Sequence, residues 1–134
     1  MLEQLTEDDT DIILLHIGTN NTPSDAEGID QWLDSLDDWE NTNHPVVALV
    51  ATIVPKRDVA ANAVVDAFNA DLRQIVAARP GDLVFLVEQN EAVTVDDISD
   101  EPIGLHPNSD GYEKMSAAWY EGLLASNALQ TCNE

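Results

Sequence analysis

Three short apolar runs, separated by segments with helical periodicity, constrain the fold of this chain most strongly. The runs are residues 11–18 (DIILLHIG), 45–54 (PVVALVATIV) and 82–88 (DLVFLVE). Each run is continuous rather than alternating, which is typical of strands buried on both faces of a parallel sheet. The strand–helix alternation predicts an α/β fold whose parallel sheet carries helices on its faces.

The helical segments have recognisable ends. Acidic residues crowd the start of the first helix, Asp58 is expected to cap the second, and Pro80–Gly81 ends it. The last helix is expected to start at Asn108 or Ser109, and residues 89–105 are expected to be mainly loop. The stripes expected to be buried are Ile29, Leu33 and Leu36 with Trp32 and Trp39; Val64, Phe68, Leu72, Ile75 and Val76; and Tyr112, Met115, Trp119 and Leu123.

Length and charge bound the class of protein. The 134 residues suit one domain over 1–134, with a tail from about residue 126, and 44% are apolar. Five Lys and Arg against 26 Asp and Glu give a net charge of −21. Two interpretations remain open, a halophilic protein with a solvated carboxylate surface and an ordinary acidic protein; the scarcity of lysine favours the first. Nucleic acids and anionic membranes would be repelled.

Other sequence features are less informative. The single cysteine, Cys132, cannot form an internal disulfide and is interpreted as a free thiol. No apolar run is long enough to span a membrane, and the first residues lack the order of a signal peptide, so the compartment stays unknown. The acidic clusters lack the ligand spacing of a calcium loop, and neither a metal nor a cofactor is expected.

Two segments could hold chemistry at the carboxyl ends of the strands, where parallel sheets bind ligands. In GTNN (18–21), Gly18 permits a sharp turn, and the Asn20 amide could donate to a developing oxyanion or simply make local turn bonds. In the second segment, Pro107 stiffens the backbone that carries His106. His106 could therefore act as a general base, or pack near the helix start.

Together, LLHIGTNN (14–21) and GLHPNSDGYEKM (104–115) resemble the SGNH hydrolase superfamily, also called GDSL esterases. That family has G-x-N-D after a central strand and D-x-x-H-P before its last helix, and the resemblance covers roughly residues 8–125. It implies a three-layer, flavodoxin-like α/β sandwich. It also implies that Asn20 completes an oxyanion hole and that His106 takes the proton of a nucleophilic serine. Gly18, Asn21 and Pro107 would then contact the substrate.

The sequence departs from the family pattern in three places. It contains no G-D-S segment and no G-x-S-x-G elbow, while Ser24 and Ser109 are better interpreted as helix caps. The family's N-terminal strand–helix portion is therefore expected to be missing, leaving a sheet edge for a second chain or an oligomer to cover. Ile103 stands where the family has its acid, although Asp100 and Glu101 are near, and Asn21 replaces an aspartate.

The resemblance implies an ester hydrolase that acts by Ser-His chemistry on acyl or acetyl esters, with the carbohydrate acetylesterase branch the most similar. This chain alone is expected to be inactive, because it lacks the serine portion. The alternative is a non-catalytic relative that binds a carbohydrate or a protein partner, which the missing serine and Ile103 favour. A nucleotide-binding domain is disfavoured, because there is no Gly-rich phosphate loop and the charge is negative. Family carbohydrate esterases are commonly exported.

Overall fold

The computed structural model describes residues 10–20, 23, 25–101 and 104–131. Its strands are β1 (Ile12–Leu15), β2 (Val47–Ala51) and β3 (Val84–Val87). Its helices are α2 (Glu27–Glu40), α3 (Val59–Ala77), α4 (Gln89–Ala92), the 3₁₀ turn η1 (Val95–Asp97), α5 (Ser109–Ala125) and α6 (Ala128–Thr131).

The three strands form a parallel sheet in the order β1-β2-β3. In register, Leu49 of β2 lies between Leu14 of β1 and Phe85 of β3. All five residues of the central strand β2 are buried, as its uninterrupted apolar run predicts. The parallel α/β architecture expected from the sequence is thus confirmed, with strands shorter than the apolar runs that contain them.

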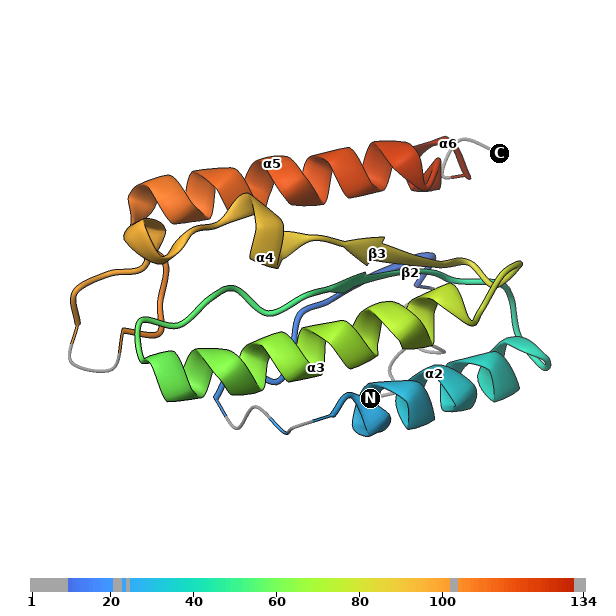
Figure 1. Ribbon diagram of the computed structural model, residues 1–134. Coiled ribbons are helices and arrows are strands. Elements are labelled where there is room, and N and C mark those ends of the chain that lie inside the picture. Colours follow the sequence, from blue (N-terminus) through green and yellow to red (C-terminus); the bar gives the residue numbers. More distant parts are fainter. Residues whose placement is uncertain (1–9, 21–22, 24, 102–103, 132–134) are drawn as a thin grey trace.

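Helices cover both faces of the sheet and make three layers (Figure 1). On one face, Ala48 and Val50 of β2 pack with the buried stripes of α2 and α3, including Leu33 and Phe68. On the other face, Val47 and Leu49 pack with α5 and α6. The alternate residues of a single strand therefore build two separate cores.

The starts of α3 and α5 are capped by side chains, with one correction to the expected caps. The Asp58 side chain accepts a hydrogen bond from the Ala61 amide at 2.7 Å, as expected for the N-cap of α3. At α5 the cap is Asn108, whose Oδ1 accepts from the Gly111 amide at 2.9 Å. Ser109 is the first residue of that helix and not its cap, so the interpretation of Ser109 as a cap was wrong.

In α3 and α5 only the first residue of the expected stripe lies outside the core. The later members pack as expected: Phe68, Leu72, Ile75 and Val76 in α3, and Met115, Trp119 and Leu123 in α5. In α3 the buried valine is Val65, whereas Val64 is 37% exposed. In α5, Tyr112 is 54% exposed, whereas the neighbouring Gly111 is buried. The first turn of α5 packs through Gly111 instead of Tyr112, because a Cβ at Gly111 would lie 2.7 Å from the Asp97 carbonyl oxygen.

Residues 89–105 are more ordered than the sequence suggests. They contain the single-turn helix α4 and the turn η1, which Thr94 and Asp97 close with a reciprocal capping box. Buried Gln89 donates from Nε2 to the Met115 carbonyl of α5 at 3.1 Å. Tertiary bonds of this kind stabilise turns too short to show a helical period.

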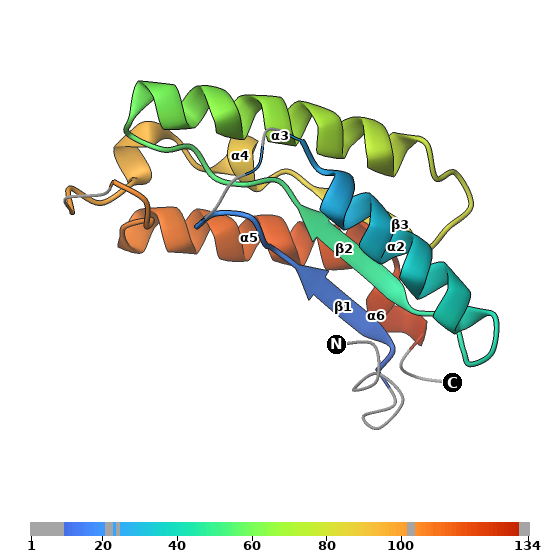
Figure 2. The ribbon, with the colours of Figure 1, turned by 90° about the horizontal axis from the view of Figure 1, so that it is seen from below.

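β1 lies at an edge of the sheet, paired on one side with β2 in the described part of the chain (Figure 2). Its Leu14 is 49% exposed although it sits in the middle of the strand. An apolar residue that open is unusual for a strand of a parallel sheet, which normally has both faces covered. In the described residues, no helix is both long and apolar enough to cross a membrane.

Candidate functional site

The two segments singled out from the sequence lie at the same end of the molecule. Figures 1 and 2 show the loop that follows β1 and the loop that precedes α5 beyond the carboxyl ends of the strands. This is the end of a parallel sheet at which ligands bind. Of the residues expected in the site, Gly18, Asn20, His106 and Pro107 are described, whereas Asn21 lies outside the described residues, as do Ser24, Ile103 and Cys132.

The loop after β1 depends on glycine at position 18. Gly18 has a φ of +106°, and a Cβ there would lie 3.0 Å from Ile53 Cδ1. The turn brings Thr19 and Asn20 to one wall of a cavity of about 390 Å³, which residues His16 to Asn20 line. The Asn20 side chain is exposed, so its amide is available to an incoming ligand.

His16 lines the same cavity and is half-buried. Its ring meets the Trp119 ring edge-on, with centroids 6.5 Å apart. Burial lowers the pKa of His16, which keeps the imidazole neutral at pH 7. Its Nε2 is buried without a hydrogen-bond partner among the described residues, so His16 lies at the edge of the cavity with its ring partly in the core.

His106 is carried on a loop that backbone hydrogen bonds close at its base. The His106 carbonyl accepts from the Ser99 amide at 2.8 Å, and the Asp97 carbonyl accepts from the Asn108 amide at 2.7 Å. The imidazole itself is 58% exposed. A firmly held backbone with an open ring suits a group that must meet a ligand.

The nearest described carboxylate to the His106 ring is that of Glu101. Glu101 Oε1 accepts from the His106 amide at 2.9 Å and lies 3.9 Å from Nε2. In a Ser-His-acid triad the acid holds Nδ1, so that Nε2 is free to take the proton of the serine. Glu101 lies near the wrong nitrogen for that role and does not replace the acid expected at position 103.

Asp97 fastens the start of α5 to η1. Both of its oxygens accept from Lys114 Nζ at 2.7 Å, and Oδ2 also accepts from the Thr94 amide. The Lys114 hydrogen bond, with those from Thr94, lowers the pKa of Asp97 to about 2. The carboxylate is thus ionised at neutral pH, and the ion pair fixes the helix that follows His106.

Two adjacent residues beyond β2 each bond one of the two candidate loops. Lys56 Nζ donates to the Thr19 carbonyl at 2.9 Å. Arg57 donates from Nε and Nη2 to the Ile98 carbonyl at 2.9 and 2.6 Å. Sequence reasoning missed this pair, although a Lys-Arg dipeptide just past the end of a buried strand was the available signal.

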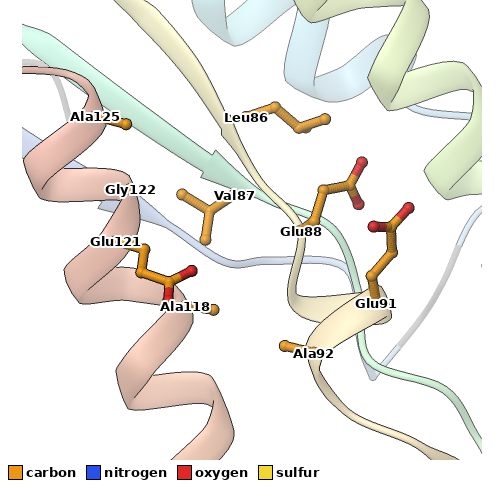
Figure 3. Close-up of a pocket in the computed structure, with 9 residues that line it drawn as sticks. All are labelled: Leu86, Val87, Glu88, Glu91, Ala92, Ala118, Glu121, Gly122 and Ala125. Atoms are coloured by element: carbon orange, nitrogen blue, oxygen red, sulfur yellow. The ribbon is translucent and has the colours of Figure 1, made fainter.

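The described residues also form an open groove of about 460 Å³ away from these loops, between β3, α4 and α5 (Figure 3). Glu88 and Glu91 lie together on one side of this groove, and Glu121 reaches toward it from α5. Glu88 is already paired with Arg73 Nε at 2.7 Å. The groove offers an acidic rim but none of the candidate catalytic residues. Within the described ranges, no three His, Cys, Asp or Glu side chains are grouped so that they could hold a metal ion.

The fold is that of the SGNH-type carbohydrate esterases, which confirms the predicted fold class. A family 3 carbohydrate esterase of Clostridium thermocellum superposes with a TM-score of 0.74 at 23% identity, covering 96% of this chain and 63% of that one. An acetyl esterase variant with a serine replaced by alanine, solved with acetate, gives 0.72 at 21%, covering 90% of this chain and 60% of the other. A family 3 carbohydrate esterase from Talaromyces cellulolyticus gives 0.69 at 20%, with the same coverages.

The chain therefore spans about three fifths of the length of the solved structures it matches. No protein-family model matches the sequence, and neither does any curated protein. At these identities the likeness defines the fold, and the activity has to be argued from the site.

Proposed function

We propose that this chain is the histidine-bearing portion of an SGNH-type ester hydrolase that acts on acyl or acetyl esters, including those of carbohydrates. The observation that carries the proposal is the link made by Lys56 and Arg57 between the loop of Asn20 and the loop of His106. It supports a common location of the two loops at the carboxyl ends of the strands, in a fold also found in three esterases.

In this proposal His106 is the general base and Asn20 the oxyanion donor. The imidazole takes a proton from a serine hydroxyl as the hydroxyl oxygen attacks the ester carbonyl, and then returns it to the leaving alcohol. The Asn20 amide donates to the oxyanion of the tetrahedral intermediate and needs no change of charge to do so. Gly18, Asn21 and Pro107 are proposed to contact the ester.

The serine has to come from outside this sequence, which contains no G-D-S segment. Either a longer form of the polypeptide or a second chain would supply it, and the open edge at β1 is where we place that portion. The chain as written is therefore expected not to hydrolyse p-nitrophenyl acetate. An active preparation of residues 1–134 alone would contradict this part of the proposal.

The decisive experiment starts upstream of the Met1 codon. If an in-frame G-D-S segment is found there, the longer protein is expressed and its hydrolysis of p-nitrophenyl acetate is measured. His106→Ala should abolish turnover, and Asn20→Ala should slow it by about 10²–10³-fold. His44→Ala and Asn43→Ala are the matched controls, because both residues lie beyond the far end of α2. Unchanged rates in both site variants would refute the assignment.

A non-catalytic relative that binds a carbohydrate or a protein is the second candidate. The position of Glu101 near His106 Nε2 favours it, because a carboxylate there competes with a serine for that nitrogen. An upstream region without a G-D-S segment, together with saturable binding of an acetylated oligosaccharide by residues 1–134, would support binding over catalysis.

A further inference from the structure

The segment between β2 and α3 is held along its length by side chains of other elements. The buried Asn69 side chain accepts from the Ile53 amide and donates to the Ile53 carbonyl, both at 2.8 Å. Asn62 Oδ1 accepts from the Lys56 amide at 2.9 Å. Residues 53–57 therefore form a fixed arm that ends in Lys56 and Arg57 at the candidate site.

Lys56 fixes the loop after β1 from this arm. Its ammonium group donates to the Thr19 carbonyl, which belongs to the same peptide unit as the Asn20 nitrogen. A charge-assisted hydrogen bond of this kind is shorter and stronger than a neutral one. Burial lowers the pKa of Lys56, which agrees with an ammonium group that is partly removed from water.

Arg57 fixes the loop of His106 from the same arm. In addition to its two bonds to the Ile98 carbonyl, its Nη2 lies 3.0 Å from Asp100 Oδ1, and its amide donates to the Gly104 carbonyl at 3.3 Å. Gly104 has a φ of +55°, and a Cβ there would lie 2.8 Å from Arg57 Cβ. Arg57 therefore contacts the loop on both sides. Its side chain bonds Ile98 and Asp100, and its own backbone and Cβ contact Gly104.

Two of the few cationic side chains in this acidic chain donate to the backbone of the candidate loops. The chain has five Lys and Arg against 26 acidic residues, and Arg73, Arg79 and Lys114 all pair with carboxylates. Arg57 also pairs with a carboxylate, that of Asp100, and both Lys56 and Arg57 donate to backbone carbonyls of the two loops that carry Asn20 and His106. Bonds to backbone carbonyls restrain the main chain of each loop directly.

We infer that Lys56 and Arg57 are positioning residues that set the separation and orientation of the Asn20 and His106 side chains, each through the loop it bonds. The catalytic meaning of that role rests on the proposed function, whereas the mechanical link does not. Displacement of a catalytic group by about 1 Å can reduce a rate by about 100-fold. Because Lys56 and Arg57 are adjacent in one hydrogen-bonded segment, they hold the two loops in a fixed position relative to each other.

The test is amide hydrogen exchange on residues 1–134, which needs no esterase activity. Lys56→Met should speed exchange at residues 18–20 about tenfold and leave Ser99 and Gly104 unchanged. Arg57→Met should do the opposite. Arg73→Met is the matched control, because it removes the same charge from a pair with Glu88 and should affect neither loop.

A second readout separates positioning from general support of the fold. In NMR spectra, the His106 ring signals should move in Arg57→Met and the Asn20 side-chain amide signals in Lys56→Met, each without the other. Arg57→Lys should partly restore the His106 signals, since it keeps the charge and one donor. If a methionine variant unfolds, Lys56→Gln or Arg57→Gln is measured in its place.

Equal effects of both variants on both loops, or no effect on either, would overturn the inference. Neither result would bear on the esterase proposal, which the hydrolysis of p-nitrophenyl acetate tests separately. Conversely, loop-specific effects in a protein whose longer form has no activity would keep the positioning role and reject the catalysis.

Discussion

The Asn69 side-chain amide makes two hydrogen bonds to the backbone of Ile53, accepting from its amide and donating to its carbonyl. Asn69 lies on α3 and is fully buried, and both of its 2.8 Å bonds go to the backbone of Ile53, just beyond the end of β2. A buried polar side chain is tolerated in this core because each of its bonding groups is satisfied. The pairing joins the core of the domain to the arm that reaches the candidate site.

Asn69→Ala should therefore destabilise the whole domain. The Ile53 amide would lose its partner in a dry interior, whereas the Ile53 carbonyl would keep the Asn90 Nδ2 donor at 2.9 Å. A buried group left unpaired costs about 1–3 kcal/mol, and that loss should appear in the free energy of unfolding measured with urea. Gln74→Ala, at an exposed position of the same helix, is the control and should change it by less than about 0.5 kcal/mol. Equal stability of the two variants would show that the pairing contributes nothing.

Two glycines should respond to alanine in opposite directions. At Gly111 a new Cβ would lie 2.7 Å from the Asp97 carbonyl oxygen and 2.8 Å from Pro107 Cβ, so the first turn of α5 would have to shift. At Gly28 in α2 nothing lies within 4 Å of the new Cβ, and alanine suits a helix better by up to about 1 kcal/mol. Thermal unfolding should show a lower Tm for Gly111→Ala and an unchanged or higher one for Gly28→Ala. A Gly111→Ala variant as stable as the parent would contradict the close packing beside His106.

The strands were predictable because each lies in a continuous apolar run, which is fully buried in β2, and the parallel sheet followed from strand–helix alternation. The burial of Val65 in place of Val64 was not predicted, because both valines lie next to the apolar stripe of α3; Val65 shares its face with Asn69, whose bond to Ile53 is a tertiary contact. The turn at α4 was missed for a similar reason. Four residues carry no period, and a bond from Gln89 to α5 stabilises the turn.

The candidate site, like the fold, could be predicted only in part from the sequence. Asn20 and His106 could be predicted because each belongs to a short motif next to a regular element. Asn20 follows a strand and His106 precedes a helix, and their residue types suit the proposed chemistry. Lys56 and Arg57 were missed: their place just past a buried strand was a signal, but bonds to backbone carbonyls leave no pattern in the residues that accept them, so the partners could not be named. That Glu101 would approach Nε2 rather than Nδ1 of His106 depends on the path of the loop, which residue order alone does not fix.

The Asp97–Lys114 pair predicts an acid-dependent difference in stability. The pKa of Asp97 is lowered to about 2 in the folded protein, so the folded state binds fewer protons here than the unfolded state between roughly pH 4 and pH 2. The stabilisation by this pair is complete above that range and is lost as the pH falls through it. Lys114→Met should thus be less stable than the parent at pH 6, and the gap should narrow as the pH falls toward 2. Glu113→Gln, a neighbour on the exposed side of α5, is the control; a gap independent of pH would exclude the ion pair as its cause.

Salt should stabilise this protein, and Arg79 identifies one place where it acts. The Arg79 side chain is 11% exposed and lies within 4.0 Å of carboxylate oxygens of Asp30, Asp34, Asp37 and Asp82. Burial and the carboxylate of Asp82 raise the pKa of Asp37 against the opposing effect of Arg79, a sign of crowded negative charge. With a net charge of −21, the Tm of the parent should rise between dilute buffer and molar salt, where the Debye length falls to about 3 Å.

Arg79→Met leaves these four carboxylates without their shared cation, so its loss of Tm should be large in dilute buffer and should shrink as salt screens their repulsion. Arg73→Met, which leaves only Glu88 of a single pair, should show a smaller loss with less dependence on salt. Differential scanning calorimetry of the three proteins from dilute buffer to molar salt measures both effects. A parent Tm that does not change with salt would remove the halophilic interpretation, and parallel curves for the two variants would show that the cluster around Arg79 has no special place in it.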